Sequence, residues 1–218
     1  MGNLITSDYS SNTIFVHSGV SSTISASFGG PGINPRDLSI DVSGNLIVVD
    51  VGNQKIYFMA GISSSINSSF SGVTTSPMGI ALDLSGNLLE SSAQTGFLDM
   101  IYIHSGISAT ISSSFSCAWD PRGLTVTATG NLVSADSNAK IIYVHSGITG
   151  TFSSSFAAPN TDFIGGLTLD DGSVNLIMCA YVADIIYIQV GITGTVSTSF
   201  SGPASTVWGA TMSTAGGC

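Results

Sequence analysis

Residues 83–88, Asp83-Leu84-Ser85-Gly86-Asn87-Leu88, contain a tripeptide that returns along the whole chain. Gly-Asn-Leu also begins at residues 2, 44 and 130, and Val174-Asn175-Leu176 is a degenerate fifth copy. Successive asparagines in this position are therefore 42 or 44 residues apart. A period of this length is typical of β-propellers, in which each repeat forms one four-stranded blade.

Three further columns recur in all five copies. An aromatic residue follows the asparagine, as Phe15, Tyr57, Tyr102, Tyr143 and Tyr187. A glycine comes next, as Gly19, Gly61, Gly106, Gly147 and Gly191. A Ser/Thr-rich run then ends in Phe28, Phe70, Phe115, Phe156 and Phe200. The short β-branched and aromatic runs between Gly, Asn, Asp and Ser indicate strands, which in the second copy we expect at about residues 38–41, 45–51, 55–59 and 64–70.

The sequence therefore predicts an all-β fold, a five-bladed β-propeller of four-stranded antiparallel blades that forms a single domain over residues 1–218. The expected repeat units are about 1–36, 37–78, 79–122, 123–165 and 166–206, with residues 207–218 completing the first blade. Residues 207–213 align with the first strand of the other units, whereas the chain begins at the turn that follows such a strand. We therefore expect the C-terminal strand to pair into the N-terminal blade and close the ring.

The segment Pro77-Met78-Gly79-Ile80-Ala81-Leu82-Asp83-Leu84-Ser85-Gly86-Asn87-Leu88 resembles the NHL repeat, whose pattern is Pro-x-Gly-apolar followed by Asp-x-x-Gly-Asn-apolar. Asn53-Gln54-Lys55-Ile56-Tyr57 is similar to its third-strand segment. The resemblance covers essentially the whole chain and implies a propeller, although NHL propellers usually have six blades. That family includes protein-interaction scaffolds, RNA-binding scaffolds and a few lyases, so the resemblance leaves the function open.

Composition excludes several classes of partner. Only 8% of the residues are charged, and 4 Lys and Arg against 13 Asp and Glu give a net charge of −9. Nucleic acid and anionic membrane surfaces require basic clusters, so neither is expected as a partner. The most apolar stretch, residues 175–192, contains Asp184 and Gln189 and aligns with strands, so no membrane insertion is expected either. The N-terminus lacks a signal-peptide pattern, and the low Lys content with high Ser, Thr and Asn content fits an extracellular or virion surface.

The candidate ligand-binding face is the one whose loops differ between copies. The repeat position before the entry-glycine column is occupied by Arg36, Met78, Arg122, Gly165 and Trp208 in the five units. Trp119 and Asp120 lie in one adjoining loop. Variable loops on a regular scaffold usually carry the binding residues. Arg with Trp suits a carboxylate or the face of a sugar ring. The alternative is that Trp208 packs where the ring closes and that the arginines pair with neighbouring Asp residues.

Other polar residues favour structural roles. His17, His104 and His145 occupy one repeat position, so they lie on different blades, too far apart to share a metal, and we expect them to be turn residues. Asp41, Asp83 and Asp170 are expected to cap turns. Cys117, Cys179 and Cys218 show no disulfide or zinc spacing. The sequence therefore predicts no catalytic residue, no cofactor and no metal site.

The fourth strand of every unit contains no charged residue, as in Ile111-Ser112-Ser113-Ser114-Phe115, and it should form the exposed outer edge of its blade. Such edges are normally guarded by charge, proline or bulges. Three functions remain open. The first is a non-catalytic scaffold that binds a glycan or a protein on the variable face. The second is a structural subunit that assembles with itself through the outer strands, and the third is a lyase or hydrolase at the channel mouth.

Overall fold

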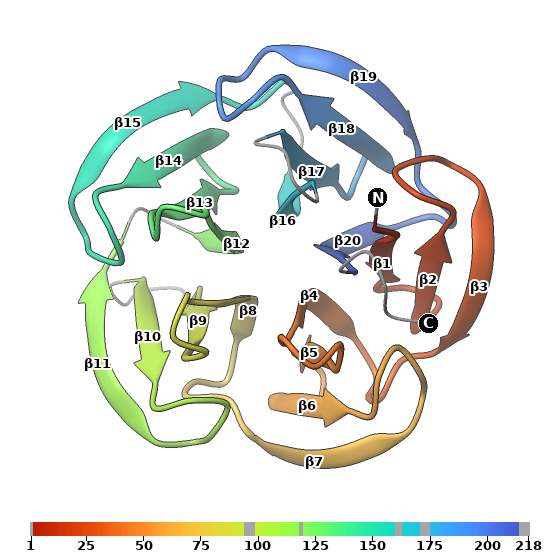
Figure 1. The fold of residues 1–218 in the computed structure, drawn as a ribbon, viewed down its shortest axis with the longest axis horizontal. Coiled ribbons are helices and arrows are strands. Elements are labelled where there is room, and N and C mark those ends of the chain that lie inside the picture. The colour runs from red at the N-terminus through yellow and green to blue at the C-terminus, as the bar shows by residue number, and fades with distance from the viewer. Residues whose placement is uncertain (1, 94–98, 118–119, 160–162, 171–174, 214–218) are drawn as a thin grey trace.

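The computed structural model describes residues 2–93, 99–117, 120–159, 163–170 and 175–213. These residues form five antiparallel four-stranded sheets, arranged as blades around a central axis (Figure 1). The chain is therefore an all-β, five-bladed propeller, as the repeat predicts. The described ranges contain no helix that is long and apolar enough to cross a membrane.

Each blade contains four strands, counted outward from the axis. The inner strands are β20 (Val207–Met212), β4 (Pro35–Ile40), β8 (Pro77–Leu82), β12 (Pro121–Val126) and β16 (Ile164–Leu169). The second strands are β1 (Leu4–Asp8), β5 (Leu46–Asp50), β9 (Leu88–Ser92), β13 (Leu132–Asp136) and β17 (Leu176–Ala180). The third strands are β2 (Thr13–His17), β6 (Lys55–Met59), β10 (Met100–His104), β14 (Ile141–His145) and β18 (Ile185–Gln189). The outer strands are β3 (Ile24–Gly29), β7 (Ile66–Ser71), β11 (Ile111–Ser116), β15 (Phe152–Ala157) and β19 (Val196–Ser201).

The ring closes within the first blade, because β20 pairs with β1 antiparallel and Leu4 lies opposite Met212. A side chain of β1 strengthens this closure. The Ser7 hydroxyl accepts a hydrogen bond from Gly209 N–H at 2.9 Å and donates one to the Arg36 carbonyl at 2.5 Å. Ser7 thereby joins the C-terminal strand to the second blade, and the predicted closure is confirmed.

The repeated asparagine is explained by one hydrogen bond that occurs in every blade. Asn45 Oδ1 accepts from Gly61 N–H at 3.0 Å, which ties the turn before the second strand to the turn after the third. The other four repeats contain the same bond at 2.9–3.0 Å, from Asn3, Asn87, Asn131 and Asn175. The expected Asp caps are also present, since Asp41 Oδ1 accepts from the Ser43 and Asn45 N–H groups. The most regular sequence columns thus encode local turns.

The hydrophobic core consists of five clusters, and each lies where two neighbouring blades meet. One contains Ile5 and Ile14 of the first blade and Leu46, Val48 and Met59 of the second. The repeated phenylalanine that ends each outer-strand motif packs on such a cluster: Phe28 lies on this one and Phe70 on the next. Blades therefore stabilise one another across their faces, and no blade buries its apolar residues alone.

Two predicted strand boundaries in the second unit are wrong. The inner strand β4 begins at Pro35 rather than at residue 38, because the pairing with β5 continues across a register shift between Pro35 and Leu38. Proline lacks an N–H group, so it is tolerated at the first position of a strand. The outer strand β7 begins at Ile66 rather than at residue 64, since Ser63 and Ser65 belong to the preceding turn.

Candidate functional site

The inner strands share an irregular entry that directs one residue toward the end of the channel. In β4, β8, β12 and β16 the pairing with the second strand shifts just after the strand begins, and β20 shows a similar shift. Such bulges redirect side chains. The variable residues lie at these register shifts. We call the surface around Arg36, Met78, Arg122 and Trp208 the mouth.

Trp208 is the centre of the mouth and is only 3% exposed. The Arg36 guanidinium carbon lies 3.8 Å from the centroid of its ring. The Tyr181 ring stacks on it with a centroid distance of 4.2 Å, and the Tyr9 ring is 5.9 Å away. The guanidinium also lies 5.0 Å from the Tyr9 ring. Trp208 thus lies where the ring closes, which agrees with the alternative that it packs at the closure. Its ring also contacts the Arg36 guanidinium in a cation–π interaction.

Arg36 forms no ion pair with a described carboxylate. Its Nη1 contacts the Met78 sulfur at 3.3 Å, and its buried Nε has no hydrogen-bond partner among the described residues. The indole Nε1 of Trp208 is likewise buried and unpartnered. Burial, followed by the nearby charge of Arg122, lowers the pKa of Arg36 to about 10, so it remains charged at neutral pH.

Arg122 differs from Arg36 because it has a counterion. Its Nε donates to both carboxylate oxygens of Asp120, at 2.9 and 3.0 Å. Asp120 has a positive φ of 53°, and its N–H donates to Asp99 Oδ2 at 2.6 Å, so this loop holds the carboxylate in place. The alternative that the arginines pair with neighbouring Asp residues is therefore correct for Arg122 and wrong for Arg36. Trp119, the remaining predicted site residue, lies outside the described residues.

The mouth also includes four residues that the sequence did not identify as candidates. Lys140 Nζ lies 3.6 Å from the centroid of the Phe163 ring, and Phe163 packs on Tyr181. Tyr9 and Tyr181 both follow a second strand, and this shared column was the signal that could have revealed them. Three of the four Lys and Arg residues thus gather with four aromatic rings at one end of an acidic protein.

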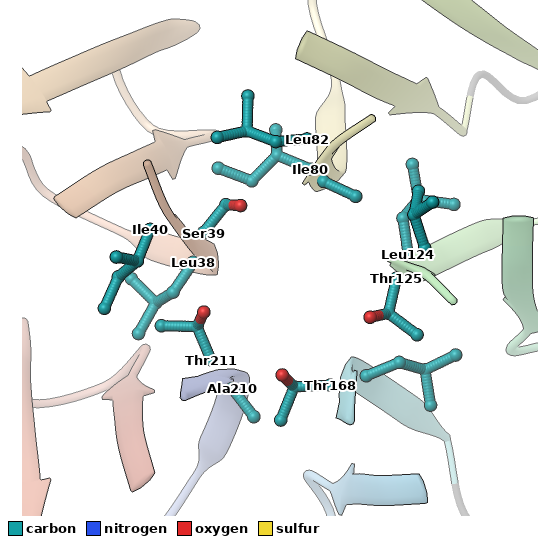
Figure 2. A pocket seen from close by; sticks show the side chains of 13 residues that line it. Leu38, Ser39, Ile40, Ile80, Leu82, Leu124, Thr125, Thr168, Ala210 and Thr211 are labelled. Atoms are coloured by element: carbon teal, nitrogen blue, oxygen red, sulfur yellow. The ribbon is translucent and has the colours of Figure 1, made fainter. Parts of the chain in front are cut away.

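The opposite end of the channel has different chemistry. A cavity of about 120 Å³ lies between the last residues of the inner strands. Figure 2 shows hydroxyl groups of Ser39, Thr125, Thr168 and Thr211 pointing into it, above a wall of aliphatic side chains. Among the residues that the structure describes, neither cations nor aromatic rings line this cavity. The described Arg and Trp residues of the candidate face therefore lie at the mouth and not at this cavity.

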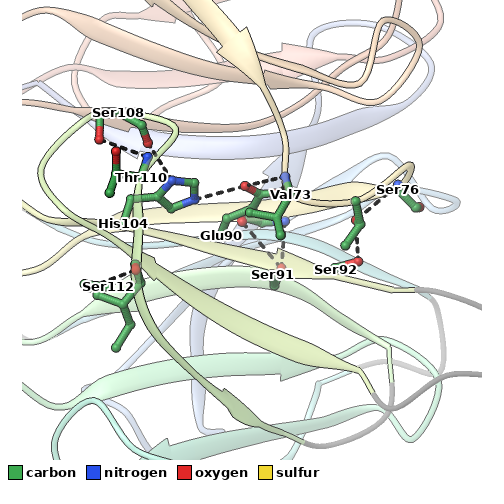
Figure 3. Close-up of polar contacts among 12 residues, drawn as sticks. Val73, Ser76, Glu90, Ser91, Ser92, His104, Ser108, Thr110 and Ser112 are labelled. Carbon is green, nitrogen blue, oxygen red and sulfur yellow. Dashed lines mark hydrogen bonds and ion pairs between the residues drawn. The ribbon is translucent and has the colours of Figure 1, made fainter.

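The three histidines end third strands and are fully buried, so their interpretation as turn residues is wrong. In each, Nδ1 donates to a carbonyl of the following turn, such as Ser108 in Figure 3. Nε2 then faces the second strand, where the partner is the hydroxyl of Thr6 or Ser134, or the carboxyl group of Glu90 at 3.0 Å. Burial lowers the pKa of His17 and of His145. These bonds make the histidines structural links within blades.

No protein-family model and no curated protein sequence matches the chain. Solved structures share its fold. A chain in the crystal structure of a nidogen/laminin complex is similar over 98% of both chains, with a TM-score of 0.70 and 16% identity. Glutaminyl cyclase from Myxococcus xanthus matches 82% of this chain and 70% of its own, with a TM-score of 0.60 and 14% identity.

Virginiamycin B lyase from Staphylococcus aureus matches 90% of this chain and 68% of its own, with a TM-score of 0.55 and 14% identity. The similar proteins thus include both a component of a protein complex and enzymes. At these identities the likeness shows a β-propeller fold. The narrower resemblance to the NHL repeat stays a prediction from the sequence.

Proposed function

We propose that the protein is a non-catalytic binding scaffold whose mouth recognises a carboxylate on a protein partner. The observation that carries this proposal is Arg36, a largely buried cation that has no acidic partner among the described residues. A desolvated guanidinium is costly unless another group compensates its charge, and stacking on Trp208 compensates only part of it. A carboxylate is the group whose geometry best matches a guanidinium.

The surroundings of Arg36 support a protein as the partner. Tyr, Trp and Arg are the residues most enriched at the energetic centres of protein interfaces, and Tyr9, Tyr181, Trp208 and Arg122 surround this site. The similar structure from the nidogen/laminin complex shows that this fold can serve in a protein complex. A glycan with an acidic sugar presents the same carboxylate, and the experiment below separates the two.

The test measures binding to an immobilised panel of peptides rich in Asp and Glu, acidic glycans, and neutral members of both classes. We expect binding to acidic peptides, weakened about 10- to 150-fold by Arg36→Met, because a hydrogen bond to a charged group contributes about 1.5–3 kcal/mol. Methionine is the residue that the next blade carries at this position, Met78, so the variant should fold. Lys55→Met is the control, because it removes the same charge outside the mouth.

Three results would reject this proposal. Binding confined to acidic glycans would make the protein a lectin. Equal binding of acidic peptides to the wild-type protein and to Arg36→Met would show that Arg36 does not contribute to binding. Equal losses of binding affinity in Arg36→Met and Lys55→Met would show that binding depends only on the net charge of the protein.

A second proposal, self-assembly through the outer strands, is favoured by their exposure. In all five blades the first four residues of the outer strand are exposed and uncharged. Each outer strand also begins with an exposed apolar residue, in chain order Ile24, Ile66, Ile111, Phe152 and Val196. The pairing of each outer strand with the third strand shifts register only near the beginning of the outer strand. The uncharged remainder of the edge is therefore open to pairing with other strands. Light scattering over a range of protein concentrations should then detect species larger than a monomer, and a monomer at every concentration would reject the proposal.

The third alternative, a lyase or hydrolase at the mouth, gains no support from the described residues. Asp120, a carboxylate beside the candidate residues, is paired with Arg122. We therefore base the proposed function on binding alone.

A further inference from the structure

One column of the inner strands combines four glycines with a single aspartate. The glycines are Gly79, Gly123, Gly166 and Gly209, and Asp37 takes the same position in β4. Glycine is required where the neighbouring inner strand comes close. A Cβ on Gly123 would lie 2.5 Å from the Gly165 carbonyl oxygen and 2.8 Å from the Leu167 backbone nitrogen. An acidic side chain in this crowded column therefore calls for a specific explanation.

The Asp37 carboxyl group lies on the axis and meets all five blades. It is fully buried, and its Oδ2 accepts a hydrogen bond from Ile80 N–H of β8 at 3.0 Å. The N–H groups of Leu38, Leu124 and Ala210, on β4, β12 and β20, also stabilise its charged form. A Cβ on Gly166 of β16 would lie only 2.7 Å from Oδ1, so this oxygen faces the fifth blade.

The N–H groups around Asp37 occupy equivalent positions on successive inner strands, each following the glycine column. Converging backbone N–H groups form sites for anionic or acceptor groups. Oδ1 has no hydrogen-bond partner among the described residues, whereas Oδ2 accepts the bond from Ile80 N–H. Complete burial raises the pKa of Asp37 well above its ordinary value, and the N–H groups offset part of this effect.

We propose that the inner-strand N–H groups form a carboxyl-binding ring on the propeller axis, which the chain fills with its own Asp37 and thereby closes the channel. The ring is a site for one small carboxylic acid or carboxylate. The mouth and the hydroxyl-lined cavity are then separate compartments, and a ligand at the mouth cannot thread through the protein. This inference does not depend on the proposed function, because none of its residues belongs to the mouth.

The test removes the side chain and offers it back as a small molecule. Asp37→Gly makes the column glycine in all five blades, and acetate has the same carbon and oxygen atoms as the side chain that is lost. Each variant is refolded in sodium acetate or in sodium chloride of equal ionic strength, at acidic and at neutral pH, and its Tm is measured. We expect acetate to raise the Tm of Asp37→Gly by about 4 °C more than that of the wild-type protein.

Asp37→Asn is the matched control, because its side chain fills the ring and leaves no room for acetate. Acetate should therefore shift its Tm no more than that of the wild-type protein. Equal acetate shifts in all three proteins, at both pH values, would overturn the proposal, as would a shift in Asp37→Asn as large as that in Asp37→Gly. If Asp37→Gly does not fold in chloride, the yield of folded protein in acetate becomes the readout, and no recovery would also overturn it.

Discussion

The inner and outer strands belong to the same repeat, yet the protein uses them in opposite ways. Inner strands are buried over most of their length, and their glycines touch the backbone of the next blade. Outer strands expose four consecutive residues and are rich in serine. The difference shows that crowding, and with it the cost of a substitution, decreases from the axis to the rim.

The largest effect is expected at the axis, from Gly123→Ala. The new Cβ would collide with backbone atoms of β16 rather than with a flexible side chain, so the strands must separate. We expect the free energy of unfolding, measured by denaturant titration, to fall by about 3–4 kcal/mol. Gly29→Ala in β3 is the control, since a Cβ there meets nothing within 4 Å. Similar losses of unfolding free energy in the two variants would refute the expectation that the cost of a substitution decreases from the axis to the rim.

A loss of about 3 kcal/mol is expected midway along the radius, from Glu90→Ala. Glu90 accepts from Val73 N–H at 2.9 Å and meets Nε2 of the buried His104, so its removal leaves both groups unpaired. Glu90→Ser should lose less, because the first and fourth blades pair their histidine with a hydroxyl group. Chemical denaturation measures both variants, and equal losses would show that the imidazole does not need a partner.

A smaller effect is expected from the pH dependence of the third strands. Folding lowers the pKa of His17 and of His145 below the ordinary histidine value of about 6.5. At acidic pH these histidines therefore bind protons more readily in the unfolded chain than in the folded protein. Stability should be complete above about pH 6.5 and decrease as the pH falls below that value. The variant Thr6→Val/His17→Met copies the Val48 and Met59 pair of the second blade and should show a shallower decrease. An unchanged slope in urea titrations would contradict this role of His17.

The smallest effect is expected at the rim, from Ser113→Lys. Ser113 is exposed in the middle of β11, so the free energy of unfolding should change by no more than about 0.5 kcal/mol. The same charge should weaken any association through the outer strands, because lysine guards strand edges. Thermal unfolding tests the first expectation and light scattering the second. A large loss of stability in the isolated protein would show that the rim is more constrained than its exposure indicates.

The fold could be predicted because its repeated columns act locally. Asn45 bonds to Gly61 within one blade, and Asp41 caps the turn that follows it, so each copy carries its own instructions. The outer position of the Ser-rich strands and the closure through residues 207–213 followed from the same repeat. The candidate site was predicted in part: Arg36, Met78, Arg122 and Trp208 do meet at one mouth.

The rest depended on groups that approach one another from different blades. The mouth gains four residues only because loops of different blades meet near one axis. These residues are Tyr9, Lys140, Phe163 and Tyr181. Within the described ranges Arg122 pairs with a carboxylate and Arg36 does not. This difference follows from a loop conformation at Asp120 that no repeat column encodes. Asp37 stands out in the sequence as a break in a glycine column, but its meaning requires the neighbouring strands.

The sequence by itself determined the number of blades and the turns within each blade, because these depend on short-range hydrogen bonds and apolar periodicity. It also located the closure of the ring, because residues 207–213 align with the first strand of the other repeats. Only the tertiary structure decided which charges are left uncompensated and what occupies the axis. Those properties arise between residues more than 40 positions apart, such as Asp37 and Ile80, and they depend on how closely the inner strands approach when the ring is complete.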